Sequence, residues 1–149
     1  MTRTVVAVCL ICLIALAVAG CSSPFRKLSE SEVDAQMRLV AERVATKILE
    51  SERDGRFEPL GDEATAAVRS GLTPEVQKAS YESIKGMYGD FQSMNYAETW
   101  VPTDGSLLVI YRFRGRFSKS DARPEIRVVM DGEGKLAGLW LKPWNARIQ

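Results

Sequence analysis

The chain has 149 residues, with 20 basic and 19 acidic side chains, three cysteines and no histidine. The lack of histidine excludes a Ser-His-Asp triad, a Cys-His pair and a histidine-ligated zinc site, so catalysis would have to use carboxylates, Lys, Tyr or Ser. The near-neutral charge gives no support for nucleic-acid binding, and no Walker loop or GxGxxG motif is present. The sequence therefore predicts no cofactor, no metal and no nucleic-acid partner.

The first twenty residues have the composition of an export signal. Arg3 precedes an uninterrupted apolar run from Val5 to Ala19, and small residues follow the run. As a helix this run is only about 22 Å long at about 1.5 Å per residue, which is shorter than the roughly 30 Å hydrocarbon core of a bilayer. We therefore expect a cleaved signal peptide over residues 1–20, with an uncleaved transmembrane anchor as the alternative.

The tetrapeptide Val18-Ala19-Gly20-Cys21, directly after the apolar run, resembles the lipobox of bacterial lipoproteins. The resemblance implies cleavage between Gly20 and Cys21, diacylglyceryl transfer to the Cys21 sulfur and acylation of the new amine, with palmitate as a typical chain. Two or three acyl chains hold a protein durably on a bilayer. The implied location is the cell envelope. In enterobacterial lipoproteins an aspartate directly after the cysteine resembles an inner-membrane retention signal, and this chain has Ser22 at that position. The implied location is therefore the outer membrane if the organism has one, and otherwise the outer leaflet of the cell membrane.

Cysteine use agrees with export. Cys9 and Cys12 would leave with the signal peptide, so Cys21 would be the only thiol of the mature chain and no disulfide could form within it. Stability would then have to come from packing. We expect residues 21–28 to be a short linker from the lipidated cysteine and residues 29–149 to be one domain.

The domain is predicted to begin with a helix. Ser29 and Glu32 have the spacing of a capping box, and Asp54-Gly55 marks the exit. Between them, apolar residues recur at helical spacing: Val33, Met37, Val40, Val44 and Ile48. Packing against a core is the preferred role for this stripe, and a helix lying on the membrane surface is the alternative.

Two shorter helices are predicted next. One ends near Ser70-Gly71, and the other starts at Thr73-Pro74, where threonine caps well and proline is favoured at the first helical position. The second of these ends within Gly86 to Gly89.

After Gly89 the apolar period changes from helical to two. The alternation predicts four strands, near residues 94–100, 107–117, 126–130 and 135–141, with turns at 102–105 and 131–134. Gly115 interrupts one apolar face and suggests a bulge or bend. The predicted class is α+β, with three N-terminal helices packed on one face of a curved, antiparallel, four-stranded sheet.

Three motifs in this domain resemble the cystatin-like cone of the nuclear-transport-factor-two-like superfamily, and in particular its small bacterial domains of unknown function. They are Asp54-Gly55-Arg56-Phe57, Gly89-Asp90-Phe91 and the closing segment from Gly134 to Trp140 with Pro143. The resemblance implies the fold more than the function. Some relatives are enzymes with a buried acid in the cone, and many only bind or assemble.

A candidate pocket follows from the expected strand register. If Val101 opposes Ser106, Glu98 lies on the helix-facing side of the sheet beside Tyr96 and Tyr111. A buried Glu98 with a raised pKa would suit proton transfer or a ligand pocket. The alternative is a carboxylate near a strand end that reaches solvent or pairs with a basic side chain.

The opposite face of the predicted sheet collects arginine and aromatic side chains, the composition of interface anchors. The candidate interface residues are Arg112, Arg114, Arg127 and Trp140, and a solvated sheet face is the alternative. Overall, the sequence favours a non-enzymatic lipoprotein, anchored in the bilayer through acylated Cys21, that binds an envelope protein or a small apolar ligand. A small envelope enzyme that uses Glu98 with Tyr96 or Tyr111 is the alternative.

Overall fold

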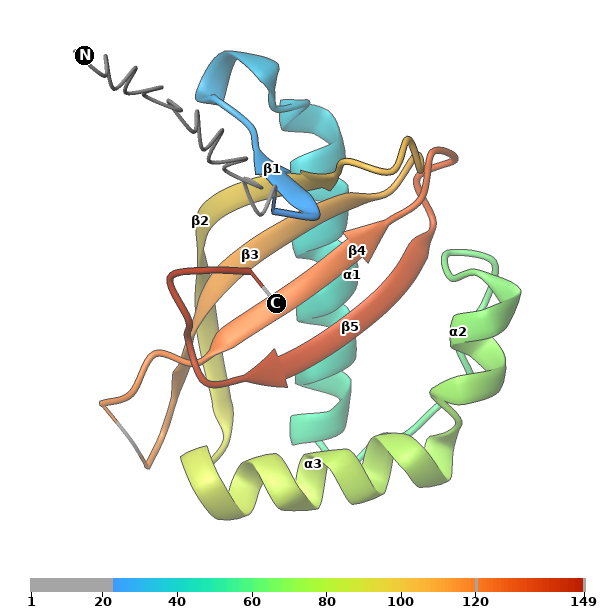
Figure 1. Ribbon diagram of the computed structural model, residues 1–149. Helices are drawn as coiled ribbons and strands as arrows, with labels where there is room; N and C mark the ends of the chain where they lie inside the picture. The colour runs from blue at the N-terminus through green and yellow to red at the C-terminus, as the bar shows by residue number, and fades with distance from the viewer. Residues whose placement is uncertain (1–22, 120, 149) are drawn as a thin grey trace, which may run out of the picture.

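The computed structural model describes residues 23–119 and 121–148, so the predicted signal peptide and lipobox lie outside the described residues. The domain is α+β, with three α-helices and one antiparallel sheet of five strands in the order β1-β2-β3-β4-β5 (Figure 1). The helices are α1 (Ala35–Arg53), α2 (Ala66–Gly71) and α3 (Pro74–Tyr88). The strands are β1 (Phe25–Lys27), β2 (Phe91–Pro102), β3 (Val109–Phe117), β4 (Glu125–Met130) and β5 (Leu136–Lys142).

The prediction of four strands that follow three N-terminal helices is wrong, because β1 is a fifth strand and precedes the helices. It occupies part of the predicted linker and pairs with the end of β2, with Phe25 opposite Pro102 and Lys27 opposite Trp100. Three residues are too few to show a period-two pattern, and this strand forms only because β2 extends far enough to receive it.

The first helix begins later than the capping box suggests. The box at Ser29 and Glu32 is present, but it closes a 3₁₀ turn at Glu30–Glu32. Helix α1 starts after Asp34, whose carboxylate accepts hydrogen bonds from the backbone N–H groups of Gln36 and Met37 at 2.8 and 3.0 Å. Its end at Asp54, followed by Gly55 with φ +74°, is as predicted.

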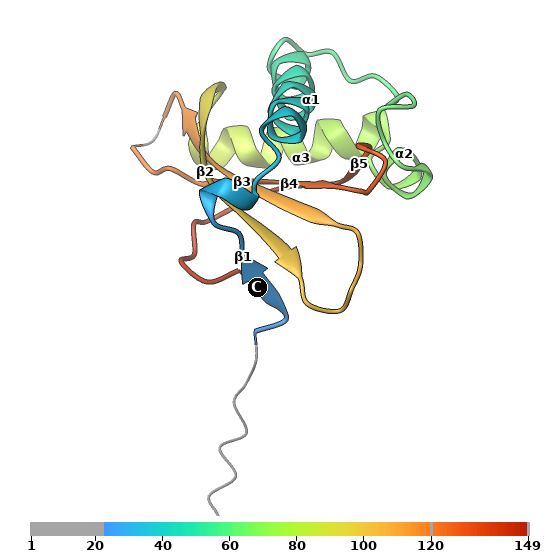
Figure 2. The ribbon, with the colours of Figure 1, turned by 90° about the horizontal axis from the view of Figure 1, so that it is seen from above.

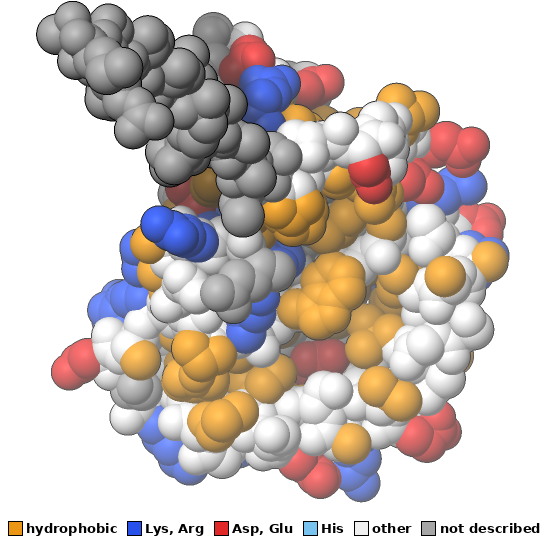
Figure 3. Space-filling model, viewed as in Figure 1, with side chains coloured by type: hydrophobic (Ala, Val, Ile, Leu, Met, Phe, Trp, Pro, Cys, Tyr) orange, Lys and Arg blue, Asp and Glu red, His pale blue; other side chains and the backbone are white. Residues whose placement is uncertain are grey.

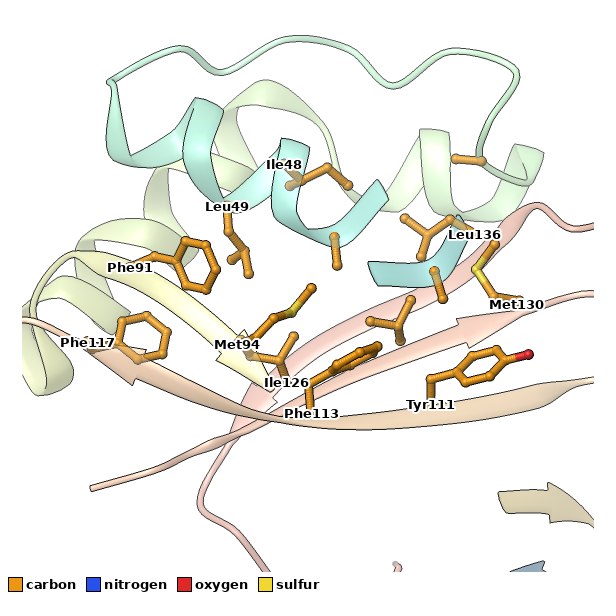
Figure 4. Close-up of a cluster of buried hydrophobic side chains, with 14 residues drawn as sticks. Ile48, Leu49, Phe91, Met94, Tyr111, Phe113, Phe117, Ile126, Met130 and Leu136 are labelled. Atoms are coloured by element: carbon orange, nitrogen blue, oxygen red, sulfur yellow. The ribbon is translucent and has the colours of Figure 1, made fainter. Parts of the chain in front are cut away.

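Helix α1 lies across one face of the sheet, while the C-terminal segment lies on the other side (Figure 2). The core forms between α1 and strands β2 to β5. It includes Ile48 and Leu49 of the helix above Phe113, Ile126 and Leu136 of the sheet (Figure 4). We call the sheet face away from α1 the outer face. A smaller apolar cluster covers part of it, in which Phe25 and Ile148 pack near Ile110 and Val129.

Of the two alternatives predicted at Gly115, a bulge or a bend, the bulge is wrong, since Gly115 pairs regularly with Met94. The irregularities in the β2–β3 ladder lie between Phe91 and Ser93 and between Tyr96 and Glu98. The second irregularity decides where the predicted pocket acid points.

Candidate functional site

Glu98 does not share a face with the tyrosines. It pairs with Arg112 across the β2–β3 ladder, whereas Tyr96 pairs with Phe113 and Tyr111 pairs with Thr99. The bulge at Ala97 reverses the alternation of side chains, so Glu98 lies on the outer face. The expected register of Val101 opposite Ser106 is also wrong, because the connection from 103 to 108 is longer than a tight hairpin turn. The placement of Glu98 on the helix-facing side is therefore corrected.

Both tyrosines stay on the helix-facing side but serve the core. The Tyr96 hydroxyl lies 2.9 Å from the Thr99 hydroxyl, and its ring packs edge-on against Phe113 with centroids 6.1 Å apart. Tyr111 is buried in the core, and burial raises its pKa to about 12. The two rings are packing residues in this arrangement.

On the outer face, Glu98 belongs to a chain of ion pairs. Lys27 of β1 reaches Glu98 at 2.7 Å, and Arg112 bridges Glu98 and Glu125, with a 2.7 Å contact to Glu125. Arg127 holds the other Glu125 oxygen at 2.6 Å. Burial raises the pKa of the Glu98 and Glu125 carboxyls, but hydrogen bonds together with the positive charges of these basic partners outweigh it and hold both pKa values below their usual range.

The C-terminal segment covers this ion-pair chain. Trp144 stacks on the guanidinium groups of Arg112 and Arg114, at 4.1 and 3.8 Å from the ring centroid, and the Asn145 carbonyl accepts a hydrogen bond from Arg112. Arg112 is fully buried as a result and Arg127 is nearly so. Of the four predicted interface residues, only Arg114 and Trp140 remain exposed.

A different feature emerges as the candidate site. A groove of about 510 Å³ lies between α3, the end of α1 and the edge strand β5, and we call it the α3 groove. Most of its lining is apolar: Leu49, Leu72, Ala79, Ile84, Met87, Ile126, Leu139, Trp140 and Leu141, with Glu52, Ser80 and Ser83 as the polar members. In the space-filling view, hydrophobic side chains surround a hollow with an acidic side chain at its back (Figure 3).

The groove exists because α3 is held at its ends and stands away from the sheet in between. Near its start, the buried Gln77 amide donates to the carbonyls of Glu58 and Leu72 at 2.8 and 3.0 Å. Near its end, the ring of Tyr88 packs on Phe117 with centroids 5.9 Å apart. Gln77 is the only fully buried residue of α3. Ile84 and Tyr88 are partly buried against the core, and the groove-lining residues Ala79, Ser80, Ser83 and Met87 stay exposed.

Glu52 is the chemically distinctive residue of the α3 groove. It lies one residue before the end of α1, its exposed fraction is 5%, and no hydrogen bond or ion pair reaches its carboxyl from the described part of the chain. Burial alone raises its pKa to about 7. At neutral pH the group is therefore divided between a neutral acid, which can donate a hydrogen bond, and a carboxylate without a counter-charge.

The helical spacing of the first helix points to Glu52, although the sequence-based prediction did not include this residue. The apolar stripe of the first helix advances by four residues from Val44 to Ile48, and the next step falls on Glu52. A charged residue that continues an apolar stripe at helical spacing is a candidate buried acid.

Comparison of the chain with known proteins decides nothing about its role. No protein-family model, no curated protein and no solved structure matches it. Within residues 23–119 and 121–148, no helix is long and apolar enough to cross a membrane, and no group of three or more acidic, cysteine or histidine side chains could hold a metal ion. The α3 groove and its buried acid are therefore the features from which a role can be inferred.

Proposed function

We propose that this protein is an envelope lipoprotein, anchored through acylated Cys21, whose domain binds a small, largely apolar ligand in the α3 groove without chemical conversion. The observation that carries the proposal is the groove itself, with its apolar lining and the buried carboxyl of Glu52. Its volume lies within the range of small-molecule sites, which are mostly apolar with a few polar groups that fix orientation. Because Glu52 is the only titratable residue among the lining residues, the lining supports binding more than catalysis.

The position of β1 supports a role at a membrane surface. Phe25 follows Cys21 by four residues, a length of chain that spans at most about 14 Å. Strand β1 pairs with the end of β2, whereas α3 leads into the start of β2, so β1 and α3 lie at opposite ends of that strand (Figure 1). An acylated Cys21 would thus hold the β1 end near the bilayer and leave α3 accessible from the aqueous side.

The proposal includes the cystatin-like fold. A long helix across an antiparallel sheet, with a groove beside it, supports that resemblance. In this interpretation the α3 groove corresponds to the interior of the cone, and Glu52 takes the place that the sequence suggested for Glu98.

The test is to identify what the groove retains. The full-length protein is purified from membranes in detergent, and small molecules extracted from it are compared by mass spectrometry with those from two variants. Ala79→Trp fills the groove from α3, and Lys78→Trp places the same bulk at the neighbouring exposed position, which does not line it. We expect a molecule that accompanies the wild type and Lys78→Trp but is lost from Ala79→Trp. Identical extracts from all three proteins would overturn ligand binding in the groove.

A further inference from the structure

We infer that the ligand of the α3 groove carries an amine, whose ammonium group pairs with Glu52 while its apolar body lies between α3 and β5. This inference rests on the proposed function and adds the chemical class of the ligand. It starts from the difference between Glu52 and the other acids withdrawn from solvent in this domain.

Those other acids are neutralised within the chain. Glu125 is fully buried and is held by Arg112 and Arg127 at 2.7 and 2.6 Å. Glu98, whose side chain is 11% exposed, is held by Lys27 and Arg112. Removing a charge from water is tolerated when a counter-charge accompanies it, and this fold supplies one on the outer face.

Glu52 is also buried, with an exposed fraction of 5%, but the described residues place no cation on it. The other residues that line the groove are apolar or hydroxyl-bearing, so none of them provides a counter-charge either. An uncompensated carboxylate in such a site is costly, and a protein–ligand ion pair would remove that cost when the groove is filled. The missing partner is therefore a cation that enters from outside.

The chemistry of the lining selects among small cations. A metal ion needs several oxygen ligands, and one carboxylate with neighbouring apolar residues does not provide them. An ammonium group needs only a few acceptors, and the Glu52 carboxylate together with the Ser80 and Ser83 hydroxyls can supply these. The apolar side chains from Leu139 and Ile84 would then contact the hydrocarbon part of the same molecule.

The experiment compares two probes with the same apolar body, 2-phenylethylamine and 2-phenylethanol. Their affinities for the full-length protein in detergent are measured by saturation-transfer NMR at pH 8, where Glu52 is ionised in the folded protein. We expect the amine to bind about tenfold more tightly than the alcohol, because a charge-assisted hydrogen bond is about twice as strong as a neutral one. Glu52→Gln should reduce amine affinity to that of the alcohol and leave alcohol binding unchanged.

Glu82→Gln is the matched control. Glu82 is an exposed carboxylate on α3 that does not line the groove, so its loss should leave the preference for the amine intact. If both probes bind the wild type with equal affinity and neither binds Ala79→Trp, the amine inference is overturned while ligand binding in the groove stands. If the amine does not bind at all, the amine inference is also overturned. If, in addition, wild type, Lys78→Trp and Ala79→Trp yield identical extracts, the proposed function is overturned as well.

Discussion

Arg112 and Glu125 form an ion pair of 2.7 Å in which both side chains are fully buried on the outer face of the sheet. Arg112 also pairs with Glu98 and stacks on Trp144, so one guanidinium joins two strands to the C-terminal segment. Residues that the sequence suggested for an interface thus hold the domain together.

The first prediction concerns this guanidinium. Arg112→Met should lower the free energy of unfolding by about 3–5 kcal/mol, because it leaves Glu125 buried with less counter-charge. Urea denaturation provides the measurement. The matched control is Arg114→Met, which removes an exposed guanidinium from the same strand and should cost no more than about 1 kcal/mol. Equal losses in the two variants would contradict the buried network.

The second prediction concerns acid. Ion pairs with Arg112 and Arg127 outweigh burial and lower the pKa of Glu125 below its usual value of 4.5. The stabilisation by this carboxylate is therefore complete above pH 4.5 and is lost as pH falls through the folded-state pKa. Glu125→Gln should destabilise the domain above pH 4.5, and the difference from wild type should shrink in more acidic solution. A difference that does not change between pH 2 and pH 6 would be inconsistent with this linkage.

The third prediction concerns Glu52, whose pKa burial raises from 4.5 to about 7. Between pH 4.5 and 7 the Glu52 carboxyl is ionised in the unfolded chain but still protonated in the folded one, so the free energy of unfolding falls as pH rises. Above pH 7 the penalty is complete, at about 3 kcal/mol given about 1.36 kcal/mol per pKa unit. Glu52→Gln should therefore match wild type near pH 4 and become progressively more stable than wild type up to pH 7. Thermal unfolding of both proteins across this pH range is the measurement. If Glu52 were solvated, the stability of wild type and of Glu52→Gln would change with pH in the same way.

The fourth prediction uses two glycines. A methyl group on Gly115 would lie 2.6 Å from the Phe117 ring and 2.9 Å from Ile126, and both of these residues are buried. Gly115→Ala should therefore cost about 1–3 kcal/mol by overpacking. Gly86→Ala is the control within α3, where a methyl group meets nothing within 4 Å, so it should stabilise the helix by about 1 kcal/mol. In denaturant titrations, the free energy of unfolding should therefore fall for Gly115→Ala and rise for Gly86→Ala.

The fifth prediction tests the anchor. Cys21→Ser removes the sulfur that the lipobox resemblance implies is acylated, so the variant should accumulate unprocessed and should incorporate no radiolabelled palmitate in cells. A matched control is Ser22→Ala, which keeps the thiol and should be processed normally. Normal cleavage and membrane retention of Cys21→Ser would rule out the lipoprotein proposal.

The amino-acid sequence by itself determined the features that depend on neighbours along the chain. The exit of α1 at Asp54-Gly55 and the start of α3 at Thr73-Pro74 were predicted because caps and turns are set within a few residues. The α+β class followed from the change of apolar period after Gly89. The lipobox is equally local, but it lies outside the described residues and remains a prediction.

Only the tertiary structure decided which side chains meet. The bulge at Ala97 placed Glu98 with Arg112, because one extra residue reverses the alternation of a strand. The α3 groove arises because α3 is held at its ends and stands off the sheet in between, and no local pattern encodes that separation. Glu52 continues an apolar stripe in the sequence, but whether it meets solvent, a cation or an apolar groove depended on how α1, α3 and β5 pack together.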